Sequence, residues 1–427
     1  MFRIIKRGFH KFPVPLLVIL MFQVNPALAS SDPFGSIDTF KLPGSNVLQR
    51  TIYNPTEFTA LSKSKSNYQI IYQGNLITFG PSLNYLSSEK IVSSGEAWTY
   101  QSDKSIIGMT NCKNFAFGLE ECGSISNLVS GKVILTAKPA NLFDAHELLV
   151  DKEGNYWFLS YPKSACSTVV ILCSAYGVSQ TKTFSDCQIN EVNPQGDPLY
   201  IWKASDHIPS SMIVRSYLNE GPRGKFVDLF HCNSIDLVNS DSVLLSSRNT
   251  DATYLIDLAT SKVKWKLGGH YWPGISLLAS GFNRTVGYES VAQHDARYLG
   301  NDLFSYFDNA SHTTNPARGV VFRVVKTAGS QKAVLVQNFP NQNGNSSLCT
   351  GSARKSDLNN FVVGWGCSLN AITLFDSSGS PIVAIDKIET PDTSYLFSHT
   401  PNILNGVDWG PDATYAMSYR VVPVLNS

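Results

Sequence analysis

Three stretches of the chain share one plan, in which a histidine opens a run of strand-forming residues and polar turn residues follow. They read His146-Glu-Leu-Leu-Val-Asp151, His231-Cys-Asn-Ser-Ile-Asp236 and His294-Asp-Ala-Arg-Tyr-Leu299. A fainter fourth copy starts at Ser352 and carries Asp357 at the same offset as the aspartates of the first two copies. Repeated bundles of short strands are typical of β-propellers, in which each repeat forms one blade. The repeat therefore predicts an all-β fold.

The place of the histidine within the repeat predicts a site. In a propeller the innermost strand of each blade borders the central channel, so equivalent positions on successive blades face the same axis. His146, His231 and His294 should then meet in one small volume. Counting the repeated units suggests six blades, and we expect a six-bladed β-propeller with its active site in the central channel.

The rest of the chain also favours strands over helices. Short β-rich runs such as Lys132-Val-Ile-Leu-Thr136 alternate with turns rich in Gly, Asn and Asp. Trp202 and Trp265 lie in two hairpins of similar plan, where an aromatic ring is expected to pack between blades rather than to bind a ligand. No linker divides the repeats, so residues 66–427 are predicted to form a single propeller domain after an extended lead-in at residues 30–65.

The N-terminus carries the pattern of a secretory signal. A basic head with Arg3, Lys6 and Arg7 precedes the apolar residues 14–22, and Ala27-Leu28-Ala29 follows. We expect a signal peptide, residues 1–29, cut after Ala29. The apolar run is shorter than the ~20 residues that a membrane span needs, and no later segment is apolar enough to serve as one. The mature protein is therefore predicted to be periplasmic or secreted, with no membrane span.

Composition limits the classes of partner. The 427 residues are 43% apolar and carry a formal net charge of +1. Such a chain can build a sizeable core and has too little net charge to suggest binding to nucleic acid or an acidic membrane surface. Three sequons, at Asn283, Asn309 and Asn345, would matter only in a host that glycosylates its exported proteins.

Eight cysteines follow the predicted signal peptide, and an even number in an oxidising compartment favours disulfides. The pairs Cys112–Cys122 and Cys349–Cys367 would close the easiest local loops. We expect only one pair within the hairpin that holds the next three cysteines, which are Cys166, Cys173 and Cys187. Cys232 then remains beside His231, either as a nucleophile or, as we favour, as a small residue that faces away from the channel because side chains alternate along a strand.

Polar neighbours of the histidines suit the binding of an anion. Asn233 lies two residues after His231 and can donate an amide N–H on the same side of the strand, whereas Asp295 should face away from His294 and hold a loop. Arg248 ends the next strand of the same blade, and its guanidinium offers the bidentate hydrogen bonds that fit a tetrahedral oxyanion. Arg318 could reach the same mouth as a further substrate-binding residue, or pair with an acidic neighbour.

Three histidines can also hold zinc. The neighbouring Arg248 would repel a dication, and no Cys-x-x-Cys pair is present, so we expect no metal and no other cofactor. The remaining histidines that we interpret as surface or rim residues are His207, His270, His312 and His399.

The chain resembles the bacterial arylsulfotransferase family, enzymes that need no nucleotide sulfate donor, and is closest to a shorter branch of it. The resemblance is clearest over about residues 140–330 and rests on the motifs Asp144-Ala-His146-Glu, Asp228-Leu-Phe-His231-Cys-Asn233-Ser-Ile-Asp236, Leu245-Ser-Ser-Arg248, Trp265-Lys-Leu-Gly-Gly269, Gln293-His294-Asp-Ala, Phe307-Asp308-Asn309 and Ser418-Tyr-Arg420. It implies a six-bladed propeller in which His294 is the nucleophile, and in which His146, His231, Asn233 and Arg248 bind the sulfuryl oxygens.

The implied reaction moves a sulfuryl group from an aryl sulfate donor to a phenolic acceptor through a sulfo-histidine. A neutral imidazole, with a reference pKa of ~6.5, can attack near neutral pH. A phenol with a pKa of ~10 leaves more easily than an alkyl alcohol, which favours aryl donors. Two alternatives stay open: a hydrolase of aryl sulfates or phosphates, and a non-catalytic propeller that binds an anionic ligand or a protein partner.

Overall fold

Short antiparallel strands dominate the structure, a computed structural model, and the predicted all-β fold is confirmed. The structure describes residues 37–425 with the exception of 42–46, 73, 93, 117–118, 139–141, 215–225, 283–288, 328–329, 369–370, 389–402, 405–406, 409–415 and 419. The predicted signal peptide, the sequon at Asn283 and His399 lie outside the described residues. The described strands all belong to one compact unit.

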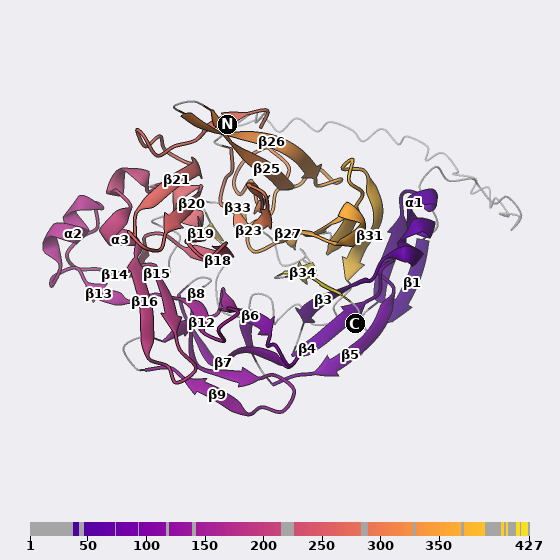
Figure 1. Cartoon of the computed structure of the whole chain (residues 1–427), viewed down its shortest axis with the longest axis horizontal. Coiled ribbons are helices and arrows are strands. Elements are labelled where there is room, and N and C mark those ends of the chain that lie inside the picture. The colour runs from indigo at the N-terminus through magenta and orange to yellow at the C-terminus, as the bar shows by residue number, and fades with distance from the viewer. Residues whose placement is uncertain are drawn as a thin grey trace, which may run out of the picture. The chain divides into compact units, whose positions relative to one another are not determined.

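In the described part of the chain, six sheets have four or more strands (Figure 1). The first holds β35 (Val422–Leu425), β3 (Ser66–Tyr72), β4 (Asn75–Phe79) and β5 (Tyr85–Lys90). The second holds β6 (Ser94–Tyr100), β7 (Ile106–Ala116), β8 (Leu119–Asn127), β9 (Val133–Thr136) and β10 (Phe143–Asp144). The third holds β11 (Leu148–Val150), β12 (Tyr156–Ser160), β15 (Gln188–Val192) and β16 (Pro198–Lys203).

The other three sheets contain the second half of the chain. The fourth holds β18 (Cys232–Val238), β19 (Ser242–Ser247), β20 (Ala252–Asp257) and β21 (Val263–Gly268). The fifth holds β23 (His294–Gly300), β24 (Leu303–Asp308), β25 (Arg318–Thr327), β26 (Ser330–Pro340) and β22 (Leu278–Ser280). The sixth holds β27 (Ser352–Lys355), β28 (Phe361–Gly364), β30 (Ile372–Phe375), β31 (Pro381–Ile388), β2 (Val47–Ile52) and β1 (Ile37–Lys41).

The remaining described elements are three short sheets and short helices. Three short sheets pair β13 (Lys163–Ala165) and β14 (Thr183–Ser185) with β17 (Phe226–Asp228), β29 (Gly366–Ser368) with β34 (Ala416–Ser418), and β32 (Ile403–Leu404) with β33 (Val407–Asp408). The α-helices are α1 (Pro55–Ala60), α2 (Val170–Ala175) and α3 (Ala204–His207). No helix in the described ranges has the length and apolar character needed to cross a bilayer.

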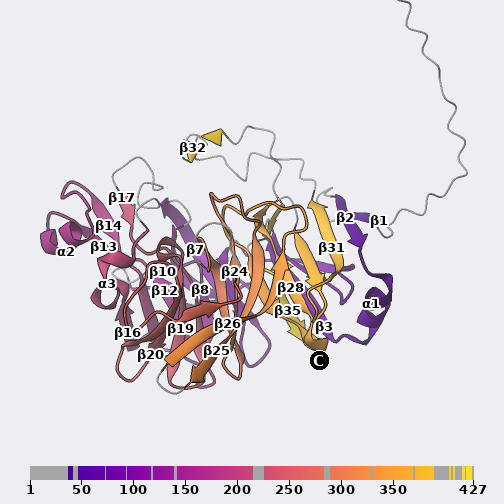
Figure 2. The same ribbon diagram turned by 90° about the horizontal axis from the view of Figure 1, so that it is seen from above.

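Each large sheet packs against the next one along the chain. Strand β6 contacts β11, β12 contacts β18, β18 contacts β23, and β23 and β24 contact β27. The series closes because β27 also contacts β35, the C-terminal strand, which pairs with β3 in the first sheet. Side chains of the first and second sheets share a core cluster. Figure 1 shows the sheets following one another around a common centre, with β18, β23 and β27 close to it, and Figure 2 shows the same sheets from above.

Aromatic side chains fill the space between neighbouring sheets, as the sequence predicts for Trp202 and Trp265. The Trp265 ring meets Phe304 edge-on at 5.2 Å between centroids and lies 6.3 Å from Phe322, both in the fifth sheet. Trp202 is fully buried, and its indole N–H donates to the carbonyl of Ser261 at 3.0 Å. Both rings therefore have a packing role.

Part of the predicted extended lead-in, residues 30–65, is folded where the structure describes it. Strand β2 pairs with β1 and with β31, so this segment extends the sixth sheet. Helix α1 begins where the side chain of Asn54 accepts the Glu57 N–H and Pro55 occupies the first turn. The sequence analysis missed these strands because their pairing partner, β31, lies near the other end of the chain.

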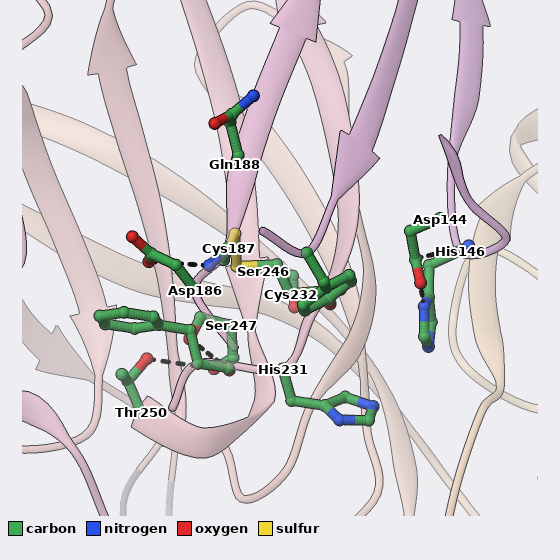
Figure 3. The surroundings of a disulfide bond; sticks show 12 residues. Asp144, His146, Asp186, Cys187, Gln188, His231, Cys232, Ser246, Ser247 and Thr250 are labelled. Atoms are coloured by element: carbon green, nitrogen blue, oxygen red, sulfur yellow. Dashed lines mark hydrogen bonds and ion pairs between the residues drawn. A yellow bond between two sulfur atoms is a disulfide. The ribbon is translucent and has the colours of Figure 1, made fainter. Parts of the chain in front are cut away.

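The four disulfides join Cys112–Cys122, Cys166–Cys173, Cys187–Cys232 and Cys349–Cys367. The first and last pairings are confirmed, and the expectation that Cys232 has no partner is wrong. The predicted single hairpin contains an insertion between β12 and β15, with β13, α2 and β14, that closes its own disulfide. Cys187 is therefore left to join Cys232 in the next sheet (Figure 3), and Cys232 has no thiol to act as a nucleophile.

The two described sequons differ in burial. Asn309 is 1% exposed, and its side-chain N–H donates to the carbonyl of Thr350 at 2.9 Å. Asn345 is exposed. In the folded protein, therefore, Asn345 can accept a glycan and Asn309 cannot.

Replacing Trp265 with alanine should lower the free energy of unfolding by about 3–5 kcal/mol, because a buried ring between two sheets would leave a cavity. Urea denaturation measures the change. As a control, Tyr271→Ala removes an aromatic ring that is 67% exposed and should change stability by less than about 0.5 kcal/mol. Equal stability of the two variants would show that Trp265 does not hold the sheets together.

Candidate active site

The structure brings the three repeated histidines together. His294 is the first residue of β23, His231 precedes β18, and His146 lies between β10 and β11. The ring centroid of His146 lies 5.3 Å from that of His231 and 6.3 Å from that of His294. All three side chains are buried. Three imidazoles from three consecutive sheets thus share one small volume.

Two of these imidazoles are each held by an aspartate that precedes them in the chain. Nδ1 of His146 lies 2.5 Å from the carboxylate of Asp144, which also accepts the His146 backbone N–H at 2.9 Å (Figure 3). Nδ1 of His231 lies 2.5 Å from the carboxylate of Asp228, which accepts the His231 backbone N–H at 3.0 Å. An ionised carboxylate only accepts, so Nδ1 carries the proton of each neutral ring and the lone pair is on Nε2.

His294 is held by a backbone carbonyl instead. Its Nδ1 lies 2.8 Å from the oxygen of Gly351. A carbonyl can only accept, so Nδ1 is the protonated nitrogen and Nε2 carries the lone pair. The carbonyl is fixed because Gly351 has a φ of +100° and its Cα faces the Phe307 ring, which lies 2.3 Å from where a Cβ would be. The adjacent carbonyl of Thr350 accepts an N–H from Asn309.

Burial favours the neutral form of His294 and of His231. It is the largest cause of a His294 pKa well below the ordinary value, and the positive charge of Arg420 lowers this pKa further. Asp295 and the Gly351 carbonyl oppose that effect without reversing it. The pKa of His231 is also lowered, chiefly by burial and against the effect of Asp228. A neutral His294 can act as a nucleophile at physiological pH.

Arg248 lies beside His231, as expected. It follows β19 in a short 3₁₀ turn (Arg248–Thr250), and its backbone N–H donates to the carbonyl of His231 at 3.0 Å. This bond helps to hold His231 at a φ of +45°, a left-handed conformation that is uncommon outside glycine. The Arg248 charge is close enough to lower the pKa of His231, and would be close enough to stabilise an anion there.

Asn233 is fully buried next to the same imidazoles. Its amide nitrogen donates to the carbonyl of Gln293 at 2.8 Å, while its side-chain oxygen has no hydrogen-bond partner within the protein. An amide nitrogen carries two N–H groups, so this bond leaves one of them for another acceptor. The bond also ties the His231 strand to the residue before His294.

Arg318 is not part of the cluster. Its Nε forms an ion pair with Asp308 at 3.0 Å, and its two other nitrogens donate to the carbonyls of Phe282 and Glu289. Of the two interpretations of the sequence, pairing with an acidic neighbour is the one that the structure shows. Each guanidinium nitrogen of Arg318 contacts a protein group, and the role of Arg318 as a substrate-binding residue stays a prediction.

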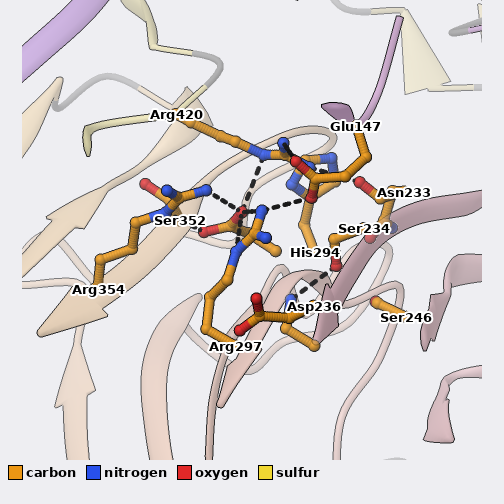
Figure 4. Close-up of polar contacts among 12 residues, drawn as sticks. Glu147, Asn233, Ser234, Asp236, Ser246, His294, Arg297, Ser352, Arg354 and Arg420 are labelled. Atoms are coloured by element: carbon orange, nitrogen blue, oxygen red, sulfur yellow. Dashed lines mark hydrogen bonds and ion pairs between the residues drawn. The ribbon is translucent and has the colours of Figure 1, made fainter. Parts of the chain in front are cut away.

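A cluster of buried charges next to the histidines was not predicted (Figure 4). The carboxylate of Asp295 contacts Arg297, Arg354 and Arg420 at 2.5–3.0 Å. These three positive charges hold the pKa of Asp295 well below its usual range, against the effect of burial. Glu147 contacts two of the same arginines, Arg297 at 2.6 Å and Arg420 at 3.0 Å.

The sequence contained a local signal for half of this cluster. An acidic residue directly follows two of the histidines, Glu147 after His146 and Asp295 after His294. The aspartates that hold Nδ1 are also local, at positions 144 and 228. Arg420 had no such signal, because it lies far from every histidine in the sequence. In the described part of the chain, no group of three or more His, Cys, Asp or Glu side chains is arranged to hold a metal ion.

Comparison with known proteins places this site in a family. The sequence profile described as Arylsulfotransferase (ASST) matches residues 130–389, more than half of the chain and all three histidines. The chain belongs to the arylsulfotransferase family. This membership supports a sulfotransferase-type enzyme that acts on small aryl substrates. No curated protein has a sequence that matches the chain.

Solved structures are similar to this arylsulfotransferase family member only at low identity. A protein of unknown function from Bacteroides caccae is 9% identical, with a TM-score of 0.44, covering 84% of this chain and 99% of its own. An inactive virginiamycin B lyase variant from Staphylococcus aureus, bound to quinupristin, is 8% identical, with a TM-score of 0.37 and coverages of 85% and 87%. A β-propeller domain from Myceliophteria thermophila is 8% identical, with a TM-score of 0.37 and coverages of 83% and 87%.

Replacing Gly351 with alanine should release His294 from its carbonyl, because the new Cβ would overlap the Phe307 ring. We expect the ¹⁵N chemical shifts of His294 to lose the signature of a single Nδ1–H tautomer. The matched control is Gly344→Ala, which has a similar positive φ of +72° and no atom within 4 Å of the new Cβ. An unchanged His294 spectrum in Gly351→Ala, with the protein folded, would contradict this account of its tautomer.

Proposed function

We propose that this protein is an exported sulfotransferase that moves a sulfuryl group from an aryl sulfate to a phenolic acceptor through a sulfo-histidine at His294. One observation carries the proposal: His294 is held by a carbonyl and its neighbours by carboxylates. With Nδ1 donating to the carbonyl, the neutral ring has its lone pair on Nε2. The carboxylates favour the protonated form of His146 and His231 once an anion is near.

The fold supports a channel site. The six large sheets follow one another around a common centre, and the C-terminal strand closes the series by pairing with β3. We take each of these sheets as one blade of a six-bladed propeller whose channel holds the histidines. Four disulfides and the signal-like N-terminus support export to the periplasm or the exterior.

The first half-reaction transfers the sulfuryl group to the protein. The Nε2 lone pair of His294 attacks sulfur in line with the leaving group, and the bond between sulfur and the aryl oxygen breaks. The phenolate leaves with that electron pair and takes a proton from the imidazolium of His146 or His231. Arg248 and an N–H of Asn233 stabilise the negative charge on the sulfuryl oxygens, usually the largest contribution in reactions of this kind.

The second half-reaction reverses these steps with a different phenol. The acceptor gives its proton to the neutral imidazole that lost one, and its oxygen attacks the sulfur. The nitrogen–sulfur bond breaks, and the electron pair returns to Nε2 of His294. Splitting one displacement into two through a covalent intermediate lowers the barrier of each.

An aromatic side chain beside the histidines supports an aryl substrate. The ring of Tyr161 lies 6.3 Å from that of His146, tilted by 56°. Its hydroxyl donates to the carbonyl of Cys232, which fixes the ring from the far end. A buried phenol ring of this kind offers an apolar face on which a substrate ring can pack.

Brief exposure to a chromogenic aryl sulfate should add one sulfuryl group to the peptide that contains His294, measured by mass spectrometry. The variant His294→Ala should show neither the adduct nor acceptor-dependent release of phenol. His312→Asn is the matched control, since His312 is exposed and already has a left-handed φ of +58° that asparagine tolerates. It should behave like the natural protein.

The same assay separates the alternatives. Continued phenol release without an acceptor, beyond one phenol per active site, would show a hydrolase. Binding of the aryl sulfate without any release, in a folded protein, would show a non-catalytic anion-binding protein, and either result would contradict the proposed transfer.

The proton donor can be identified through its aspartate. Asp144→Asn and Asp228→Asn each remove the negative charge that favours an imidazolium, at His146 and His231 respectively. At the true donor the loss of kcat should reach about 10²–10⁴-fold with leaving phenols of high pKa and should nearly vanish with nitrophenols. Rates that depend on the leaving group as in the natural protein, in both variants, would exclude this role.

A further inference from the structure

One guanidinium contacts all three strands that carry the histidines. Nη1 of Arg420 lies 3.0 Å from the carboxylate of Glu147, the residue after His146. Nη2 donates to the backbone carbonyl of Asn233, two residues after His231, at 2.5 Å. Nε forms an ion pair at 2.9 Å with Asp295, the residue after His294. Each nitrogen of Arg420 therefore holds a different histidine-bearing strand (Figure 4).

The position of Arg420 depends on the end of the chain. It directly precedes Val421, whose N–H donates to the hydroxyl of Ser352 in the sixth sheet, and β35 follows, paired with β3. Arg420 is 5% exposed, and its side chain reaches into the cluster from this closing segment. The same C-terminal segment therefore closes the ring of sheets and places the guanidinium of Arg420 in the charge cluster.

We propose that Arg420 is a positioning residue for the nucleophile: it fixes the spacing of the three imidazoles and keeps His294 unprotonated. This inference rests on the proposed transfer through His294. Each guanidinium nitrogen of Arg420 contacts a protein group, so the role we assign to Arg420 is exerted through Glu147, Asn233 and Asp295.

The charges around His294 set the sign of the effect. Arg420 and His146 face it from other segments, Asp295 adjoins it on its own strand, and the Gly351 carbonyl accepts its Nδ1–H. The Arg420 charge opposes protonation of His294, whereas Asp295 and the carbonyl favour it. Loss of Arg420 would leave Asp295 and Glu147 less neutralised, so it should raise the pKa of His294 and move the acid limb of the reaction to higher pH.

The other two arginines of the cluster, Arg354 and Arg297, make different contacts. Arg354 contacts Asp295 alone, through two nitrogens, and is the most exposed of the three. Arg297 joins Asp295 to Glu147 and donates to the carbonyl of Ile235, further along β18. Neither arginine contacts Asn233, so neither joins all three histidine strands.

Two substitutions separate the charge of Arg420 from its geometry. Arg420→Lys keeps the charge but cannot reach three groups, so kcat should fall about 10-fold or more with the acid limb unmoved. Arg420→Gln loses both, so kcat should fall and the acid limb should rise by about one pH unit. Arg354→Gln is the comparison variant, and its effect on both readouts should be clearly smaller.

A titration of ¹⁵N-histidine-labelled protein reads the His294 pKa directly and needs no substrate. If the proposed transfer fails but Arg420→Gln still raises the His294 pKa, the electrostatic half of this inference stands alone. An Arg420→Gln protein that is folded, with an unchanged His294 pKa and natural kcat, overturns the proposal.

Should Arg420→Gln fail to fold, Glu147→Gln replaces it. Removing this carboxylate leaves the Arg420 charge less neutralised, so the His294 pKa should fall instead of rise. A rise in that variant would overturn the proposal.

Discussion

Neutralisation of buried charge at the centre of the ring is the constraint on which the rest of this structure depends. Asp295 and Glu147 lie in the interior, where Asp295 pairs with Arg297, Arg354 and Arg420 and Glu147 pairs with Arg297 and Arg420. Removing one partner from a buried ion pair typically costs about 3–5 kcal/mol. The charged groups come from the fifth and sixth sheets, the turn between β10 and β11, and the closing segment, so these parts must meet in one arrangement for every charge to be paired.

This arrangement also determines the chemistry. Three imidazoles in one buried volume differ only in what holds Nδ1, and that difference assigns their roles. In the proposed mechanism, the carbonyl and a nearby guanidinium keep His294 neutral for attack on sulfur, whereas Asp144 and Asp228 favour the protonated form of their partners. Membership of the arylsulfotransferase family and this asymmetry support sulfuryl transfer from independent directions.

The sequence predicted what is local or repeated. The histidine repeat indicated the strands and the meeting of the imidazoles, and the Leu244-Leu-Ser-Ser-Arg248 strand indicated the place of Arg248. Long-range partners left no such trace: Arg420 reaches Glu147 from the far end of the chain, and Cys187 joins Cys232 in the next sheet. Two interpretations of Arg318 stayed open, because an arginine that pairs with an acidic neighbour, as Arg318 does with Asp308, looks the same in sequence as one that binds a ligand.

The most direct test of a covalent intermediate is a quenched-flow experiment with an aryl sulfate and no acceptor. A carbonyl-held His294 that is sulfated and then waits for a phenol predicts a rapid burst of one phenol per active site, followed by almost no release. The burst should be absent in His294→Ala. If the folded natural protein shows no burst of phenol, whether or not it releases phenol steadily, the account is contradicted.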